Sequence, residues 1–133
     1  MARREQGVPE RFVFRQVDYR DVPTFLADGE VRSKNHPDQQ ACHQTCYQNL
    51  VQRRGTAEFQ LPFGGVVNDC VAFYFSPLTS FTCSIHRGNV QVIPPNGGEP
   101  TSSRLEDRVF LVANVSDLFR AGLQCCFSNY ALN

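Results

Sequence analysis

Two segments of the chain each place a run of β-forming residues directly before a short helical pattern, and this limits the possible folds more than any other feature. In the first segment, the Phe and Val residues of 11–17 (RFVFRQV) predict a β-strand. A helix is expected to follow, with Asp21 as its N-cap and Gly29 as its stop. Three apolar residues share one face of that helix at helical spacing: Val22, Phe25 and Leu26.

The second segment repeats this order in the C-terminal part of the sequence. Residues 108–113 (RVFLVA) predict an apolar strand, and a helix is expected behind it. Asn114 or Ser116 is the expected cap of this helix, and Gly122 is its expected end. The β-forming residues of 123–127 (LQCCF) indicate a further strand.

The middle of the chain contains less regular signals. Residues 44–54 predict a helix that ends at Gly55, and residues 62–65 (PFGG) are typical of a turn. Residues 70–75 (CVAFYF) are apolar at successive positions, which predicts a central strand covered on both faces. The Pro, Gly and Ser residues of 93–103 predict a surface loop.

The mixed order of strands and helices favours the α+β class. A chain of 133 residues has the length of one domain, so residues 1–133 are expected to form a single domain. With 41% apolar and 20% charged residues, the composition is that of a soluble globular protein. No apolar run approaches the ~20 residues that span a bilayer, and the first twelve residues contain no signal-peptide core. These features predict a cytoplasmic protein without membrane contact.

The charge balance excludes a protein that coats nucleic acid by bulk electrostatics, because the formal net charge is zero. A local basic cleft remains compatible with this balance. All basic residues except Lys34 are arginines, which suit phosphate binding, but a GC-rich coding sequence gives the same bias. Arg15 lies within an apolar strand, where its charge must face either solvent at a sheet edge or a ligand. Both interpretations of Arg15 remain open.

The six cysteines are expected to be free thiols, because disulfides belong to secreted proteins and no signal peptide is present. One cluster contains metal-ligand residue types: His36, Cys42, His43 and Cys46. Structural zinc sites normally show two closely spaced ligand pairs, and this cluster lacks the second pair. No metal site is therefore predicted, and the sequence contains no Walker loop, dinucleotide-binding or nucleophile-elbow motif.

Three stretches, taken in their order, carry a resemblance to a known family. Residues 14–18 (FRQVD) and the helix behind them are similar to its opening strand and helix, and residues 50–54 (LVQRR) resemble the helix end that presents its catalytic arginine. Residues 64–77 (GGVVNDCVAFYFSP) resemble its most specific motif, a glycine pair followed by an aromatic run. The chain thus resembles the DarT family, the DNA ADP-ribosyltransferase toxins of bacterial toxin–antitoxin systems. The resemblance runs from residue 12 to about 131 and covers the N-terminal two thirds of the family's domain.

The resemblance implies an ADP-ribosyltransferase-like fold, a split antiparallel β-sandwich with short helices, and a cleft that binds NAD as co-substrate. In this chemistry the bond between ribose and nicotinamide breaks through an oxocarbenium-like state, which a DNA base then traps. Such a reaction needs a clamped pyrophosphate and an oriented ribose.

The resemblance also assigns individual residues. Arg54 (or Arg53) matches the position of the catalytic arginine, which also contacts the cofactor, and its guanidinium suits a pyrophosphate. Arg54 is assigned to this role, and Arg53 is expected to lie on the solvated side. Arg15, Gln16 and Val17 match the cofactor-binding strand. An arginine at position 15 fits the guanine-modifying branch of the family better than the thymine-modifying branch, which has histidine there.

The chain departs from the family pattern at several positions. Asp18 stands where the family usually has histidine, Cys70 where it has tyrosine, and Ala72 where it has proline. The family's catalytic glutamate lies beyond the last matched motif, so the fold is expected to be truncated at its C-terminus. The other acidic residues considered match no such motif: Glu58, Asp69, Glu99 and Glu106.

Two functions follow as expectations. The first is NAD-dependent ADP-ribosylation of a base in single-stranded DNA by a cytoplasmic toxin, either active or an inactive fragment, with a cognate antitoxin of the macrodomain or NADAR type. The second is a non-enzymatic module that keeps the fold and binds NAD or nucleic acid. The sequence leaves open the modified base, the DNA motif and the oligomeric state.

Overall fold

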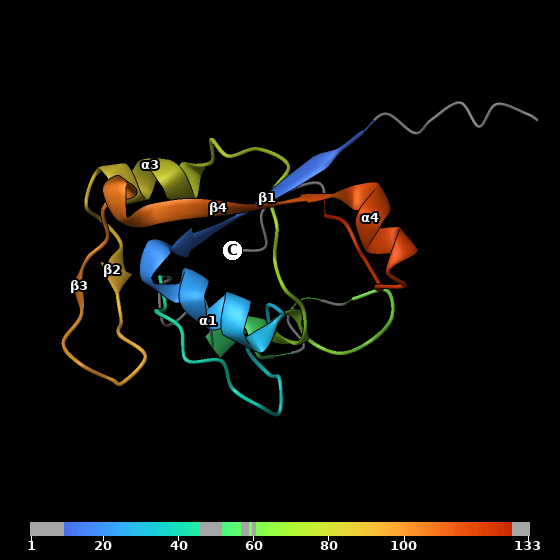
Figure 1. Ribbon diagram of the computed structural model, residues 1–133, viewed down its shortest axis with the longest axis horizontal. Coiled ribbons are helices and arrows are strands. Elements are labelled where there is room, and N and C mark those ends of the chain that lie inside the picture. The colour runs from blue at the N-terminus through green and yellow to red at the C-terminus, as the bar shows by residue number, and fades with distance from the viewer. Residues whose placement is uncertain (1–9, 46–51, 57–58, 60, 129–133) are drawn as a thin grey trace, which may run out of the picture.

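The long β-ribbon of the protein joins two strands that are far apart in the sequence. A computed structural model describes residues 10–45, 52–56, 59 and 61–128. Strand β1 (Phe12–Asp18) pairs antiparallel with β4 (Arg108–Asn114), so that Phe12 lies opposite Asn114 and Asp18 opposite Arg108. The two strands cross the molecule side by side (Figure 1). Both strands were predicted from their β-forming residues, and both predictions are confirmed.

A short helix follows each strand of the ribbon, as the sequence predicted. Helix α1 (Val22–Asp28) ends at Gly29, which adopts a φ of 70° that suits glycine. Helix α4 (Val115–Arg120) begins at Asn114, whose side chain accepts a hydrogen bond from the Ser116 N–H. Of the two expected caps, Asn114 is therefore the one used. The presence of helices and antiparallel strands confirms the α+β class.

Two details of the first strand–helix unit differ from the sequence-based expectation. A 3₁₀ turn (Tyr19–Asp21) separates β1 from α1, and Asp18, not Asp21, caps this turn with its side chain. Asp21 makes no side-chain cap bond to α1, because its carboxylate binds His43 instead. Leu26 does not belong to a buried face, since 77% of it is exposed.

The segment of 70–75, predicted as a central covered strand, is not a strand. It meets β1 at one bridge only, between Tyr74 and Phe14, and Phe75 is 52% exposed. The predicted strand at 123–127 is also absent, and these residues form no ladder. Both segments fail to form strands for the same physical reason. Their apolar side chains line a cleft and a surface patch, described below, and do not cover the two faces of a sheet.

The expected helix over 44–54 is confirmed only in part. Residues 52–54 are helical, and Gly55 follows them as a turn residue. Gln44 is not helical, because it forms a β-bridge with Ile93. Residues 46–51 of this prediction lie outside the described residues. The predicted turn at 62–65 is confirmed, and its two glycines have φ values of 79° and 81°.

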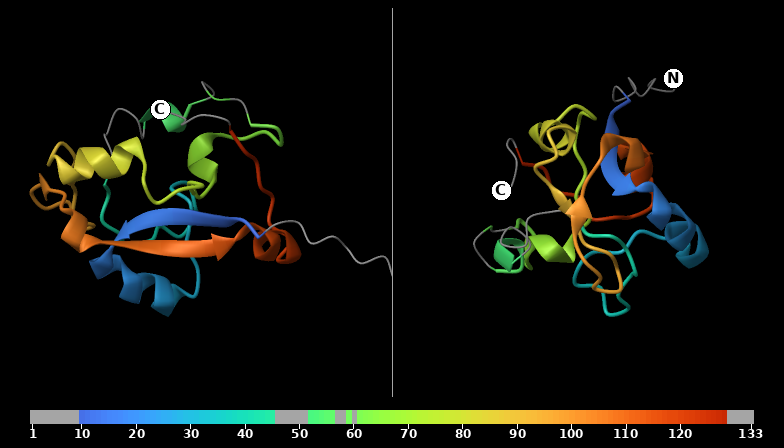
Figure 2. Two further views of the ribbon diagram at one scale, coloured as in Figure 1. Left: turned by 90° about the horizontal axis from the view of Figure 1, so that it is seen from above. Right: turned by 90° about the vertical axis from the view of Figure 1, so that its left-hand side faces the viewer.

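The remaining elements lie beside the ribbon. Helix α3 (Ser80–His86) begins at Thr79, and strands β2 (Gln91–Val92) and β3 (Thr101–Ser102) pair as a small antiparallel sheet. The predicted loop of 93–103 is thus shorter than expected, because its last part pairs with β2. Helices α1 and α3 lie on opposite sides of the ribbon (Figure 2).

The hydrophobic core is small. Its buried side chains come from β1, the 3₁₀ turn at 67–69, α3 and the β2 region: Val13, Val17, Val67, Ile85, Val90 and Val92. In the described part of the chain, no helix has both the length and the apolar character needed to cross a membrane.

Candidate functional site

A cleft of about 780 Å³ opens beside the C-terminal half of β1. Its walls come from β1, the segment of 31–45, the helical residues 53 and 54, the segment of 67–74, α3 and the first residue of β4. This volume lies within the range of ligand and cofactor pockets. The structure brings together in this cleft all the site residues that the sequence singled out: Arg15, Gln16, Val17 and Arg54.

Arg15 faces the cleft and not a solvent-exposed sheet edge. Its Nη1 donates a hydrogen bond to the carbonyl oxygen of Ala72 at 3.0 Å, whereas its Nε is shielded from solvent and has no partner in the described part of the chain. Burial lowers the pKa of the guanidinium, although an arginine keeps its charge. A shielded donor without a partner is costly, so this group is suited to an anionic ligand.

Arg54 brings a second guanidinium to the same cleft. It is half-buried, and its charge lies close enough to Arg15 to lower the pKa of Arg15 further, after the larger effect of burial. Arg53, which we expected on the solvated side, is exposed and holds its guanidinium 5.8 Å from the ring centroid of Phe59. Arg53 nevertheless lines the cleft as well. Two segments distant in sequence therefore concentrate positive charge in one place.

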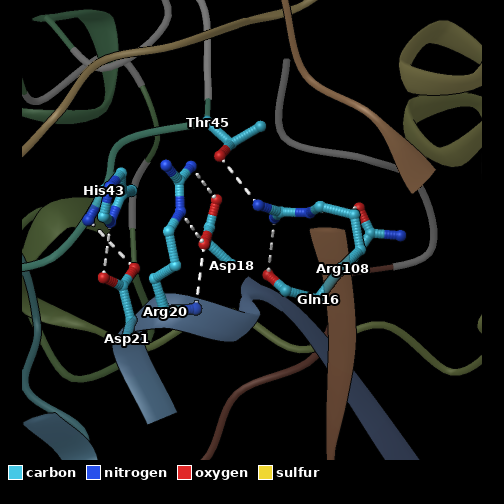
Figure 3. A network of polar contacts seen from close by, with 7 residues as sticks. All are labelled: Gln16, Asp18, Arg20, Asp21, His43, Thr45 and Arg108. Atoms are coloured by element: carbon cyan, nitrogen blue, oxygen red, sulfur yellow. Dashed lines mark hydrogen bonds and ion pairs between the residues drawn. The ribbon is translucent and has the colours of Figure 1, made fainter. Parts of the chain in front are cut away.

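Arg108 is a cleft residue that the sequence-based reasoning missed. Its Nε donates to the Gln16 side chain at 3.2 Å and its Nη1 to Thr45 Oγ1 at 2.9 Å, whereas Nη2 donates to the Gln16 backbone carbonyl at 3.2 Å (Figure 3). Burial lowers the pKa of this guanidinium too. Gln16 in turn donates to Thr82 Oγ1 of α3 at 3.4 Å. The signal that could have revealed Arg108 is its position opposite Asp18, which depends on the register of the ribbon.

Five arginines line this space, which we call the arginine cleft: Arg15, Arg32, Arg53, Arg54 and Arg108. Arg32 is paired with Glu30 at 2.7 Å and Arg53 is exposed, so the positive charge within the cleft comes mainly from three half-buried guanidiniums, those of Arg15, Arg54 and Arg108. Val17 differs from these residues because it is only 6% exposed and belongs to the hydrophobic core beneath the cleft.

Asp18 is one of two carboxylates that line the arginine cleft among the described residues, and its side chain is fully shielded. Arg20 holds it with two side-chain bonds, Nε to Oδ1 and Nη2 to Oδ2, each 2.8 Å long, and with its backbone N–H (Figure 3). Burial alone would raise the pKa of Asp18, but the hydrogen bonds from Arg20 outweigh it and hold the pKa below its usual value.

Asp21 is the second carboxylate, and it fastens the segment of 31–45 to the end of β1. Its Oδ2 accepts the His43 backbone N–H at 2.9 Å, and its Oδ1 lies 2.7 Å from His43 Nδ1. The contact to Asp21 is made by Nδ1, so the second ring nitrogen, Nε2, is left for another partner. No described residue bonds to this Nε2.

Among the other acidic residues considered from the sequence, the three that the structure describes do not line the arginine cleft. Asp69 accepts hydrogen bonds from the Val66 N–H and the Asn35 amide, each at 2.8 Å, and these bonds hold the pKa of Asp69 below its usual value. Glu106 is exposed and lies 3.6 Å from Arg104, and Glu99 is exposed in a loop. Glu58 lies outside the described residues.

The cysteines that were described contain no disulfide among them. Cys42 and Cys70 line the arginine cleft, and burial raises the pKa of the Cys42 thiol to about 11. Within the ranges that the structure describes, no three His, Cys, Asp or Glu residues form a group that could hold a metal ion. His43 of the sequence cluster is bound to Asp21, and Cys46 falls outside those ranges.

Comparison with known proteins adds a family assignment to this geometry. The family model described as "ssDNA thymidine ADP-ribosyltransferase, DarT" matches residues 14–132, which include most of β1, the residues that line the arginine cleft, and α4. No curated protein and no solved structure matches the chain.

Proposed function

This chain belongs to the DarT family of single-stranded-DNA ADP-ribosyltransferases, and from that premise we propose that it transfers ADP-ribose from NAD to a base of single-stranded DNA. The observation that carries the proposal is the convergence of three guanidiniums in one cleft of about 780 Å³. The pyrophosphate of NAD carries two negative charges, and arginine forks bind such groups with two hydrogen bonds each.

Each cleft residue has a role in the proposal. Arg54 clamps the pyrophosphate and stabilises charge during the reaction, which is why we assign it as the catalytic residue. Arg15 offers its Nε, which has no partner among the described residues, to the same dinucleotide. Gln16 and Val17 form the strand along which the nicotinamide side lies, and Arg108 fixes the Gln16 side chain in place.

The transfer exchanges one bond at the anomeric carbon. The bond from ribose C1′ to the nicotinamide nitrogen breaks, nicotinamide leaves as a neutral ring, and a base nitrogen bonds to C1′ and gives up a proton. His43 Nε2 is the cleft atom that we propose to take this proton, because Asp21 contacts Nδ1 and leaves Nε2 for another partner. Asp18 and Asp21 are already occupied by Arg20 and His43.

The finer features of the family enter as parts of the same proposal. They are a single domain over residues 1–133, the split β-sandwich of ADP-ribosyltransferases, and a toxin acting in the cytoplasm. We also propose that the toxin has a cognate antitoxin of the macrodomain or NADAR type. Support for all of them comes from the family assignment.

Label transfer tests the proposal directly. The protein is incubated with NAD labelled in its adenylate half and with single-stranded oligonucleotides of A and C that contain either one thymine or one guanine. We expect label on one of the two oligonucleotides, and this comparison also identifies the base. Arg54→Ala should abolish transfer, whereas Arg104→Ala, an exposed arginine outside the cleft, should leave it unchanged. If the protein binds NAD but transfers label to neither oligonucleotide, the proposed enzymatic activity is contradicted and the non-enzymatic binding module is favoured.

A further inference from the structure

Three phenylalanine rings gather on the protein surface where β1 begins and α4 starts. The ring centroids of Phe75 and Phe127 lie 5.9 Å apart with their planes at 23°, and those of Phe119 and Phe127 lie 6.5 Å apart. These residues are 52%, 58% and 54% exposed in the order Phe75, Phe127 and Phe119. We call this cluster the phenylalanine patch. Grouped exposed aromatic rings on a soluble domain mark an interaction surface.

A shallow groove next to the patch adds a positive charge to it. The groove has a volume of about 280 Å³ and is lined by Arg11, Val115 and two rings of the patch. The Arg11 carbonyl accepts the Val115 N–H at 2.9 Å, which fixes the start of α4 against the start of β1. Arg11 is exposed, and no carboxylate of the described residues pairs with its guanidinium. Stacking rings and an available cation therefore lie side by side.

The segment of 72–75 connects this groove to the arginine cleft. At one end, the Ala72 carbonyl accepts the hydrogen bond from Arg15. The bridge between Tyr74 and Phe14 is antiparallel, so Phe75 lies beyond it toward the N-terminal end of β1, where Arg11 is. Arg11 directly precedes β1 and lies four residues before Arg15, a separation of about 13 Å along extended chain. The segment of 72–75 thus runs from the cleft to the patch, and α4 lies beside the start of β1 (Figure 1).

From this arrangement we propose that the phenylalanine patch binds single-stranded DNA beside the nucleotide in the cleft: flanking bases stack on the rings, and Arg11 contacts a backbone phosphate. The inference rests on the proposed function, which supplies the substrate class. Proteins bind unpaired strands by this combination of aromatic platforms and cationic side chains. Each ring is about half exposed, which leaves aromatic surface on the patch for contact with a base. In a duplex the base faces are covered, so the surface selects unpaired DNA.

A tryptophan reporter can test the contact directly, because the chain contains no tryptophan. In Phe75→Trp, a stacking base should quench the single indole. The matched control is Leu26→Trp, at a 77% exposed position of α1 that lines neither the groove nor the cleft. Both variants are titrated, without NAD, with a single-stranded oligothymidylate and with a duplex of the same length. We expect saturable quenching at position 75 by the single strand, weaker quenching by the duplex, and no change at position 26.

Affinity measurements complete the test. By fluorescence anisotropy of a labelled single strand, Phe127→Ala should weaken binding about tenfold, in the range expected for one stacked base. Phe127→Leu keeps apolar volume but removes the ring, and it should lose a similar factor. Arg11→Ala should reduce the salt dependence of binding by about one phosphate contact. Leu78→Ala, at an 83% exposed position outside the groove, should bind as the unmodified protein does.

Each outcome separates this inference from the proposed function. Unchanged DNA affinity in Phe127→Ala and Phe127→Leu, with no quenching at position 75, overturns the patch as a DNA surface while label transfer still supports the enzyme. Absence of any DNA binding also overturns it, and calorimetry of NAD binding then reports on the arginine cleft independently. If position 75 is instead covered in a dimer, its fluorescence depends on protein concentration and not on DNA, which assigns the patch to a second copy of the chain and overturns the DNA contact.

Discussion

The two ends of β1 distribute polar and apolar side chains in opposite ways. At the C-terminal end, Asp18 and Asp21 are 1% and 3% exposed, and each is held by hydrogen bonds from a cationic or imidazole partner. At the N-terminal end, the phenylalanine patch leaves its rings more than half exposed. Buried carboxylates stabilise a fold only while their partners remain, whereas exposed rings contribute little to stability and remain available to a ligand.

The largest effect is expected when the Asp21 carboxylate is removed. Asp21→Ala leaves the nearly buried His43 ring and its backbone N–H without their acceptor, and the segment of 31–45 loses its attachment to β1. A shielded donor that loses its acceptor costs about 1–3 kcal/mol in the free energy of unfolding, and Asp21→Ala leaves two such donors. Urea denaturation measures this, with Asp117→Ala as control, because its ion pair with Arg120 is exposed and contributes less than about 0.5 kcal/mol. Equal urea midpoints for the two variants would show that the buried pairs at the C-terminal end of β1 do not stabilise the fold.

The second prediction concerns NAD binding in the arginine cleft, at the same C-terminal end of β1. Arg54→Ala should weaken NAD binding by about 2–4 kcal/mol, because a charge-assisted clamp in a shielded cleft is lost. Isothermal titration calorimetry gives the affinity, with Arg104→Ala as the matched exposed control. Identical NAD affinities in the two variants would remove Arg54 from the binding site.

A smaller effect is expected from the charge of Asp18 and depends on pH. The pKa of Asp18 is lowered in the folded protein, so its stabilising contribution is present above the unfolded pKa of about 4 and is lost as the pH falls through the folded value. Asp18→Asn should therefore cost about 1–2 kcal/mol near neutral pH, discounted because Arg20 is partly exposed. Thermal unfolding between pH 2 and pH 7 should show the variant and the unmodified protein converging at low pH. A difference in thermal stability that stays constant across that pH range would contradict a stabilising role for the charge of Asp18.

The smallest effect belongs to the phenylalanine patch. Phe119→Ala should lower the free energy of unfolding by about 1 kcal/mol or less, because half of the ring is already in contact with water. The same urea denaturation measures it. A loss comparable to that of Asp21→Ala would mean that the patch is a part of the core, and the contrast between the two ends of β1 would disappear.

Local patterns in the sequence were sufficient for the elements of the ribbon. The β-formers around Phe14 and Val109 predicted both strands, and Gly29 marked the end of α1, because strand propensity and helix stops act within a few residues. The same local reasoning was wrong for 70–75. Apolar residues at successive positions predict a doubly covered strand, but an apolar side chain can equally line a cleft or a surface patch, and only its neighbours in space decide which.

The roles of individual polar residues were decided by contacts between distant segments. Asp21 has the residue type and spacing of a helix cap, yet it binds His43, which lies 22 residues away. A cap bond contributes about 1 kcal/mol, whereas a buried carboxylate with an imidazole and a backbone donor gains more, so the tertiary contact prevails. Arg15 was left open between solvent and ligand, and its position in the cleft follows from the bond to Ala72.

The sequence by itself determined the strand–helix order, the glycine that ends α1 and, through its motifs, the family to which the chain belongs. The tertiary structure alone decided that Arg15, Arg54 and Arg108 face one cleft, and that Phe75 and Phe127 meet at the opposite end of β1. The physical reason lies in the distance over which each effect acts. Propensity and capping depend on neighbours within one or two turns of chain, whereas the register that places Asp18 opposite Arg108 joins residues 90 positions apart and is set by packing.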